Sequence, residues 1–175
     1  AAANVGTPAE KASPLATTYT KAQFDDFVKR AVADTSTFGA NTANDWFYNQ
    51  TNGHIYRFVQ AGATGGTAAS SNNSGLTASE KAAGTTIKGV AGVEDQQGYL
   101  VTITNGAENS FVANIVAQRG TAWINVNDNA TEGTYVVDAT APTAEQGKIE
   151  YKNYAAGEPN NYGSGEDSTQ MYTNG

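Results

Sequence analysis

A stretch rich in possible metal ligands lies near the end of the sequence, at residues 157–167 (Gly-Glu-Pro-Asn-Asn-Tyr-Gly-Ser-Gly-Glu-Asp). Its carboxylates are Glu158, Glu166 and Asp167, and its side-chain amides are Asn160 and Asn161. Hard cations such as Ca²⁺ are held by oxygen ligands, which loops supply readily. Glu158 and Asn160 flank a proline, which restricts the backbone so that both side chains can point toward one position. The stretch therefore predicts a calcium-binding loop.

Two further acids, Asp128 and Glu132, lie upstream on a turn that Gly133 closes. Taken alone, a pair of acids on a turn is most often only solvated. If the fold brings them to the loop at 157–167, five carboxylates share a small volume, and like charges at about 4–6 Å repel one another. Bound Ca²⁺ would relieve that repulsion, so we expect the loops to be looser without the metal.

The sequence offers little material for catalysis. His54 is the only histidine and cysteine is absent, so a nucleophilic triad, a zinc site and a disulfide framework lack residues. His54 lies in an alternating strand pattern and is interpreted as a structural or surface residue. Glu158 and Glu166 could form a glycosidase-like carboxylate pair, but the surrounding loop favours calcium. We predict that the protein is not an enzyme.

The composition points to an acidic, folded protein. The chain has 175 residues, 39% hydrophobic and 10% aromatic residues, and a net charge of −7. Such a charge argues against nucleic acid and anionic membranes as partners, because both attract basic patches. No apolar run is long enough for a membrane span, so no membrane insertion is expected. The start, Ala1-Ala2-Ala3-Asn4, resembles what remains after cleavage at a small-residue site and favours a secreted or cell-surface protein.

The first part of the chain is expected to form a helix and a hairpin. Residues 1–18 read as an extended leader, and residues 20–34 as a helix with an apolar stripe and a capping box of Thr20 and Gln23. Two strands, 46–48 and 54–59, flank a turn that contains the hairpin signal Asn52-Gly53. Residues 60–80 are interpreted as a long surface excursion, and 80–97 fits neither helix nor strand clearly.

The second part is expected to alternate strands with one helix. A short strand is predicted at 98–104, and a helix begins at Asn105, which can cap it with Glu108, and ends at Gly120. Further strands are predicted at 123–127 and 135–137, and residues 138–156 are expected to be mostly loop.

In this order and spacing, the segments resemble the C-type lectin-like domain over roughly residues 46–172. The resemblance rests on Gly98-Tyr99-Leu100-Val101-Thr102-Ile103 with Glu108-Asn109-Ser110-Phe111, on Trp123-Ile124-Asn125-Val126-Asn127-Asp128 with Thr131-Glu132-Gly133, and on Glu158-Pro159-Asn160-Asn161 with Gly163-Ser164-Gly165-Glu166-Asp167. It implies an α+β C-type lectin-like fold with two helices, small antiparallel sheets and a long loop region, here carrying an N-terminal helical extension.

The resemblance also implies a role for each candidate residue. The primary, sugar-binding Ca²⁺ site would take Glu158, Asn160 and Glu166. The auxiliary Ca²⁺ site would take Asp128, Glu132, Asn161, Glu166 and Asp167, with Glu166 bridging the two. Pro159 is expected to be cis, and the Glu-Pro-Asn triplet implies a preference for glycans of the mannose type.

The chain also departs from the family pattern. The family has cysteines and, after Glu-Asp, a Trp-Asn-Asp strand with further primary-site ligands, whereas Ser168–Gly175 ends before such a strand. We therefore expect an extension at 1–45 and a lectin-like domain at 46–175 that lacks its last strands. The sequence leaves three explanations open: a fragment, strands supplied by a second chain, or a domain with a purely structural role.

Two functions follow from these expectations. The first is an extracellular Ca²⁺-dependent carbohydrate-binding module, a lectin or adhesin. The alternative is a structural subunit of a surface assembly or filament that self-associates through the 1–45 extension or an open sheet edge, without binding sugar.

Overall fold

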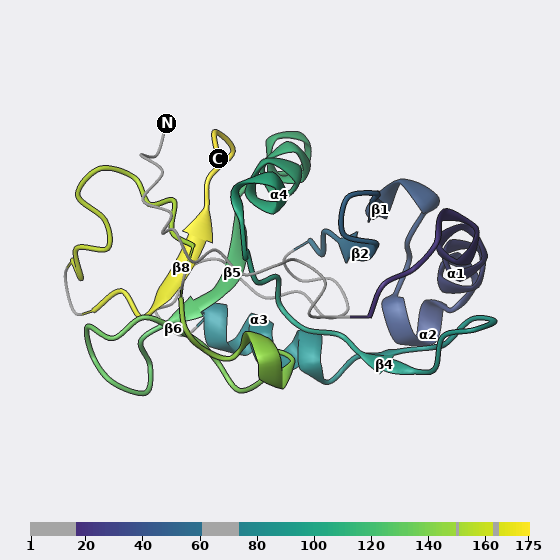
Figure 1. The fold of residues 1–175 in the computed structure, drawn as a ribbon, viewed down its shortest axis with the longest axis horizontal. Helices are drawn as coiled ribbons and strands as arrows, with labels where there is room; N and C mark the ends of the chain where they lie inside the picture. Colours follow the sequence, from purple (N-terminus) through teal and green to yellow (C-terminus); the bar gives the residue numbers. More distant parts are fainter. Residues whose placement is uncertain (1–16, 61–73, 150, 163–164) are drawn as a thin grey trace.

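The computed structural model describes residues 17–60, 74–149, 151–162 and 165–175. The helices are α1 (Lys21–Ala33), α2 (Thr35–Phe38), α3 (Ser74–Ala83) and α4 (Gly106–Arg119), with 3₁₀ turns η1 (Ala43–Asp45) and η2 (Thr143–Glu145). The strands are β1 (Trp46–Asn49), β2 (His54–Arg57), β3 (Thr86–Ile87), β4 (Gln96–Gln97), β5 (Ala122–Asn127), β6 (Val136–Val137), β7 (Gly147–Lys148) and β8 (Ser168–Met171). Figure 1 shows α1 and α2 at one end of the long axis and β6 and β8 toward the other. The predicted α+β class is confirmed.

The largest sheet of the described residues has the strand order β7-β6-β5-β8, with every neighbouring pair antiparallel. The apolar and β-branched residues of β5 suit this central position. Its register with β8 shifts between Ile124 and Asn127, so the ladder is irregular near the end of β5. The strand ends there, and the next residue is Asp128.

Helices α3 and α4 pack on opposite faces of the β5–β8 pair (Figure 1). Val112 and Val116 of α4 pack with Met171 of β8 and Ile124 of β5. On the other face, α3 approaches so closely that a Cβ at Gly75 would lie 2.5 Å from the Ser168 side chain. Successive strand residues point to opposite faces, so each helix covers one set of side chains.

The N-terminal helix forms as predicted. Thr20 caps α1 by accepting from Gln23 N at 3.2 Å, while the Gln23 side chain accepts from Thr20 N at 2.9 Å. The buried face of α1 packs against aromatic residues of α2 and β1: the ring of Phe27 lies 5.0 Å from Trp46 and 6.4 Å from Phe38, edge to face in both cases. The predicted hairpin is β1–β2, and Trp46 pairs with Arg57.

A buried polar contact ties this hairpin to α4. Glu108, only 4% exposed, accepts hydrogen bonds from the Tyr56 hydroxyl at 2.7 Å and from Thr104 N at 3.0 Å. Asn52 donates to the same Tyr56 hydroxyl at 2.8 Å. The hairpin of the N-terminal part and the long helix of the C-terminal part therefore share one carboxylate.

Two local expectations are wrong, and one strand was not expected. Within 60–80, residues 61–73 lie outside the described part, but Ser74–Ala83 is a helix rather than a surface excursion, in keeping with its Ala, Leu, Glu and Lys content. No strand forms at 98–104, because the backbone groups of that segment bond to different partners rather than to one neighbouring strand. Gly98 N donates to Thr85 O, and Thr104 N donates to the Glu108 side chain. A strand not predicted, β8, forms at Ser168–Met171, where Met171 becomes buried against α4.

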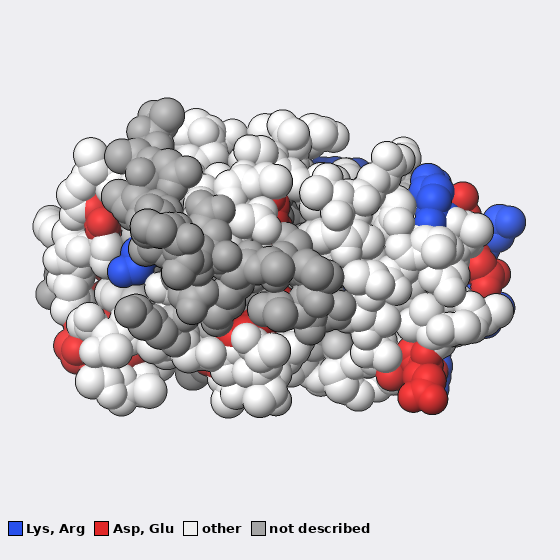
Figure 2. Space-filling view, viewed as in Figure 1, with Lys and Arg blue, Asp and Glu red and all other residues white. Residues whose placement is uncertain are grey.

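The division at residue 45 stays a prediction, and the leader at 1–18 lies outside the described residues except for its last two. Within the described part, no helix is both long and apolar enough to cross a bilayer. In Figure 2, many of the Lys and Arg side chains on this face lie at the α1 end, close to Asp and Glu. That end carries the exposed ion pairs Lys21–Asp25 and Arg30–Asp26, so much of its positive charge is balanced locally.

Candidate functional site

The β5–β8 ladder brings the two predicted halves of the site together. Asp128 follows the last residue of β5, and Asp167 precedes the first residue of β8. Asn127 pairs with Ser168 in the ladder, and Asp128 N donates to Asp167 O at 3.2 Å. Two acids far apart in sequence therefore start from adjacent points of the sheet.

Asp128 is the buried acid of the site, with 2% of its surface exposed. Its Oδ2 accepts from Gly133 N at 2.8 Å, and its backbone oxygen accepts from Thr131 N at 3.0 Å, so the carboxylate closes its own turn. Gly133 has φ +77°, a conformation that glycine adopts without strain. Asp128 Oδ1 is buried and has no hydrogen-bond partner among the described residues.

Asn161 links the turn to the loop at 157–167. Its Nδ2 donates to Glu132 Oε1, and its Oδ1 accepts from Glu166 N at 3.0 Å. Asn161 has φ +53°, a left-handed conformation that asparagine tolerates better than most residues. The Glu166 side chain in turn accepts from Tyr162 N at 3.2 Å. This chain of bonds joins Glu132, Asn161 and Glu166 in one exposed network.

Glu158 and Asn160 form a second, exposed pair. The peptide bond between Glu158 and Pro159 is cis, as the resemblance implied. Glu158 accepts from Asn160 Nδ2 at 2.8 Å and from Asn160 N at 3.1 Å, so the two side chains point toward each other. Both residues are open to solvent. A carboxylate and an amide side by side can accept from and donate to one neighbouring pair of hydroxyl groups.

The hydroxyl of Tyr135 lies close to the acids of the site, and its pKa is affected by their charge. Its hydroxyl donates to Glu166 O at 2.7 Å. Burial, together with the negative charges of Asp128, Glu132 and Glu166, raises the pKa of Tyr135 to about 12. Deprotonation would add another negative charge near these carboxylates, which is why they oppose it.

The structure therefore joins Asp128 to Asp167, and Glu132, Asn161 and Glu166 to one another. The acidic side chains do not all point toward one position. Among the described residues, no three His, Cys, Asp or Glu side chains lie close enough together to hold a metal. Without a cation the carboxylates repel, and each of Asp128, Glu132, Glu158 and Glu166 instead accepts from an amide N–H.

The residues of the auxiliary set nevertheless fit a calcium ion. They supply carboxylate and amide oxygens, the ligands that Ca²⁺ takes. A buried carboxylate oxygen without a partner is costly, and Asp128 Oδ1 is such an atom. A cation at that oxygen would compensate its burial. For Glu158 and Asn160, the fit rests on residue type and on their side-by-side position alone.

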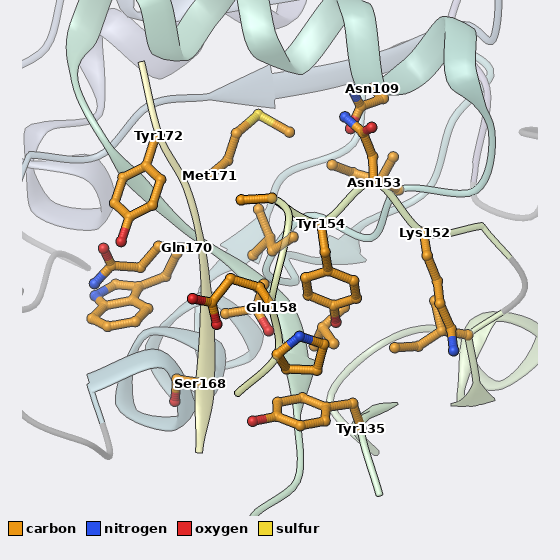
Figure 3. Close-up of a pocket in the computed structure, with 18 of the residues that line it drawn as sticks. Asn109, Tyr135, Lys152, Asn153, Tyr154, Glu158, Ser168, Gln170, Met171 and Tyr172 are labelled. Atoms are coloured by element: carbon orange, nitrogen blue, oxygen red, sulfur yellow. The ribbon is translucent and has the colours of Figure 1, made fainter. Parts of the chain in front are cut away.

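A groove of about 670 Å³ runs beside the site, along β8. Figure 3 shows Tyr154 and Tyr135 on one side and Gln170 and Tyr172 on the other, with Glu158 between them. The lining of the groove therefore includes Glu158 and Pro159 together with aromatic and amide side chains. Its volume lies in the range of ligand pockets in proteins.

Some residues that shape the site were not predicted from the sequence. Tyr135 was interpreted only as part of a strand, although it is held by Glu166. The sequence predicts only a strand at Asn125 and Asn127, and the structure shows that both side chains are buried. Two amides at alternate positions of an otherwise apolar strand were the available signal. His54, expected to be structural or at the surface, is buried in β2.

A comparison with known protein families found a match over the C-terminal part of the chain. Residues 94–175 match the family model described as the lectin C-type domain. No solved structure matches the chain. The matched residues include α4, the β5–β8 sheet and every residue of the candidate site.

Proposed function

We propose that residues 94–175, which match the lectin C-type domain, form a domain that binds glycans through Ca²⁺, as a lectin or adhesin module that is secreted or exposed at the cell surface. A domain of this family indicates ligand binding, carbohydrate in particular, rather than catalysis. The calcium dependence, the choice of a mannose-type glycan and the adhesin role are our proposal.

The observation that carries the proposal is the buried, unpartnered Oδ1 of Asp128. It lies at the start of the turn that carries Glu132, whose carboxylate is bonded to Asn161 of the opposite loop. Ca²⁺ would be held by Asp128, Glu132, Asn161, Glu166 and Asp167 at the auxiliary site. When bound, the ion would neutralise the carboxylates, and open coordination positions for sugar hydroxyls would belong to the primary site.

Sugar recognition is assigned to Glu158, Asn160 and Glu166. Glu158 can accept a hydrogen bond from one hydroxyl of a vicinal pair, and the Asn160 amide can donate to the other. Their hydrogen bond at 2.8 Å supports this assignment, because it places the two groups side by side. Tyr162, 80% exposed in the same loop, offers a ring face for stacking against a sugar.

The test combines calcium and sugar titrations of the whole chain. We expect Ca²⁺ to raise the melting temperature, since a ligand that binds the folded state stabilises it. We expect a mannose-type glycan to bind in Ca²⁺ and to dissociate in EDTA, as measured by calorimetry. Glu158→Gln, which removes the charge but keeps the shape, should abolish sugar binding.

Glu94→Gln is the matched control, because Glu94 is an exposed acid outside the site. It should bind the glycan as the wild type does. Binding of the glycan that survives EDTA would overturn the calcium dependence. Failure of Ca²⁺ to change the melting temperature at millimolar concentration would overturn the metal site itself.

The edge strand β8 favours a second candidate function, a structural subunit that self-associates or takes up a strand of another chain. Among the described strands β8 has one partner, β5, and residues of β8 line the groove. Unpaired strand edges are templates for strand addition. Light scattering over a range of concentrations tests this: assembly that grows with concentration supports it, and a monomer at the highest concentration rejects it.

A further inference from the structure

A buried polar layer lies between α3 and β5, beside the Asp128 turn. Asn125 and Ser79 are each 1% exposed and Asn127 is 6% exposed. Strand alternation puts Asn125 and Asn127 on the same face of β5, and Asp138 and Thr140 meet them from the segment after β6.

Asp138 is the centre of this layer. Its carboxylate accepts from Thr140 N at 2.9 Å, from Asn127 Nδ2 at 3.1 Å and from Asn125 Nδ2 at 3.3 Å. Its backbone N–H donates back to Asn125 Oδ1 at 3.1 Å. Burial acts to raise the pKa of Asp138, but hydrogen bonds, from Thr140 above all, outweigh it and lower that pKa. The acid is therefore held as a charged acceptor.

The far end of the layer reaches α3. The hydroxyls of Ser79 and Thr140 lie 2.6 Å apart, and the Thr140 hydroxyl also bonds to Asp138. The same carboxylate thus connects the helix on one side with the end of β5 on the other. This arrangement allows the two ends of the layer to be tested separately.

Buried amides are not needed for stability alone. Apolar side chains of similar volume could fill the same space, and replacing a satisfied polar network in that way is often neutral or stabilising. What a network adds is direction, because each hydrogen bond fixes an angle as well as a distance. The network also lies where strand pairing is least regular, since the β5–β8 register shifts between Ile124 and Asn127.

We propose that Asp138, acting through Asn127, positions the carboxylate of Asp128 for Ca²⁺. Asn127 is bonded to Asp138 by its side chain and directly precedes Asp128. Fixing the Asn127 side chain fixes the direction in which the chain enters the turn that Gly133 N closes on Asp128. The inference rests on the proposed calcium site, and it makes Asp138 and Asn127 positioning residues that do not touch the ion.

The experiment compares Asn127→Ala with Ser79→Ala. The first cuts the layer next to the turn, and the second cuts it at the helix end. Calcium affinity is measured by calorimetry well below the melting temperature, and hydrogen exchange of residues 128–133 is measured in the metal-free protein. Asn127→Ala should weaken Ca²⁺ binding about tenfold or more, as is typical when a residue that supports a metal ligand is removed. It should also speed hydrogen exchange of the turn.

Ser79→Ala should lower the melting temperature but leave both the calcium affinity and the exchange of 128–133 unchanged. If Asn127→Ala binds Ca²⁺ like the wild type, or if Ser79→Ala weakens Ca²⁺ equally, the positioning role is overturned. If Asn127→Ala does not fold, Asp138→Asn replaces it, because it keeps the shape and removes the charged acceptor.

The two proposals can fail separately. A wild-type chain that binds no Ca²⁺ overturns the proposed metal site. The hydrogen-exchange measurement then decides by itself whether Asp138 and Asn127 hold the turn at 128–133 in place. Faster exchange of the turn in Asn127→Ala than in Ser79→Ala supports positioning of the turn, and equal exchange in the two variants overturns it.

Discussion

Tyr56 donates its hydroxyl hydrogen to Glu108 at 2.7 Å, across 52 positions of sequence. The hydroxyl also accepts from Asn52, and the Tyr56 ring lies 5.0 Å from that of Phe111. Burial, aided by the negative charge of Glu108, raises the pKa of Tyr56, so the phenol stays protonated and keeps donating. One side chain of the hairpin is therefore bonded to the helix that precedes the site sheet.

Tyr56→Phe should lower the free energy of unfolding by about 1–3 kcal/mol, because it leaves a buried carboxylate oxygen and the Asn52 amide each without a partner. Urea denaturation measures the change. Tyr172→Phe is the control, since Tyr172 is 60% exposed and should change stability by less than about 0.5 kcal/mol. Equal stability of the two variants would show that the contact contributes nothing.

His54 should make the protein less stable in acid. It is 6% exposed and its Nε2 has no partner among the described residues. Burial lowers the pKa of His54 below 6.5, and the nearby Glu108 opposes this only in part. The unfolded chain therefore takes up the proton first as the pH falls below about 6.5, so stability from neutral His54 is present above that pH and is lost below it.

The measurement is the free energy of unfolding at several pH values between 7.5 and 5. His54→Leu removes the titrating group, so its stability should fall less steeply over this interval than that of the wild type. Carboxylates titrate in both proteins and cancel in the difference. The same slope in both proteins would mean that burial of His54 does not couple to protonation.

Tyr135 should titrate near pH 12 and respond to calcium. Its pKa is raised by burial and then by the charges of Asp128, Glu132 and Glu166. A pKa raised above the unfolded value of about 10 gives stability that is complete below pH 10 and lost as the pH rises toward 12. A cation among these carboxylates would offset their charge, so Ca²⁺ should lower the pKa of Tyr135.

Ultraviolet titration of the wild type minus Tyr135→Phe isolates this tyrosine from the other buried ones. The difference curve should have its midpoint near pH 12 in EDTA and move down in Ca²⁺. A midpoint near 10 in EDTA would contradict the placement of the acids around Tyr135. A midpoint that calcium does not move would place the ion elsewhere.

Local signals were enough to predict α1, α4 and the hairpin. The capping pairs Thr20–Gln23 and Asn105–Glu108 and the pair Asn52-Gly53 act over a few residues, and their bonds are present in the structure. The strand β8 was not predictable in that way, because Ser168–Met171 carries a weak pattern and becomes a strand only by pairing with β5. The segment 98–104 has the pattern of a strand but does not form one. The backbone N–H of Thr104, for example, donates to the Glu108 side chain rather than to a neighbouring strand.

The same distinction between local patterns and tertiary packing applies to the candidate site. The residue types and their order pointed to Asp128, Glu132 and the loop at 157–167, and the structure brings those segments together through β5 and β8. Sequence could not show that Asp128 is buried with an oxygen that has no partner among the described residues, or that Asp138 is bonded to Asn127 beside it. Both features depend on how α3 packs on the sheet and how β6 pairs with β5, which no local pattern encodes.

A hydrophobic core joins the N-terminal helix to the rest of the chain. Phe27 is 2% exposed and packs on Trp46 of the hairpin, and Val90, from the segment that follows β3, belongs to the same core. Phe27→Ala should cost about 3–5 kcal/mol, measured by denaturation followed by circular dichroism, whereas the exposed Lys29→Ala should cost less than about 0.5 kcal/mol. Because Trp46, Val90 and the Tyr56–Glu108 bond connect this core to both parts of the chain, we expect one transition with a lowered midpoint. Two transitions, of which only the first moves, would instead make residues 1–45 an independently unfolding extension.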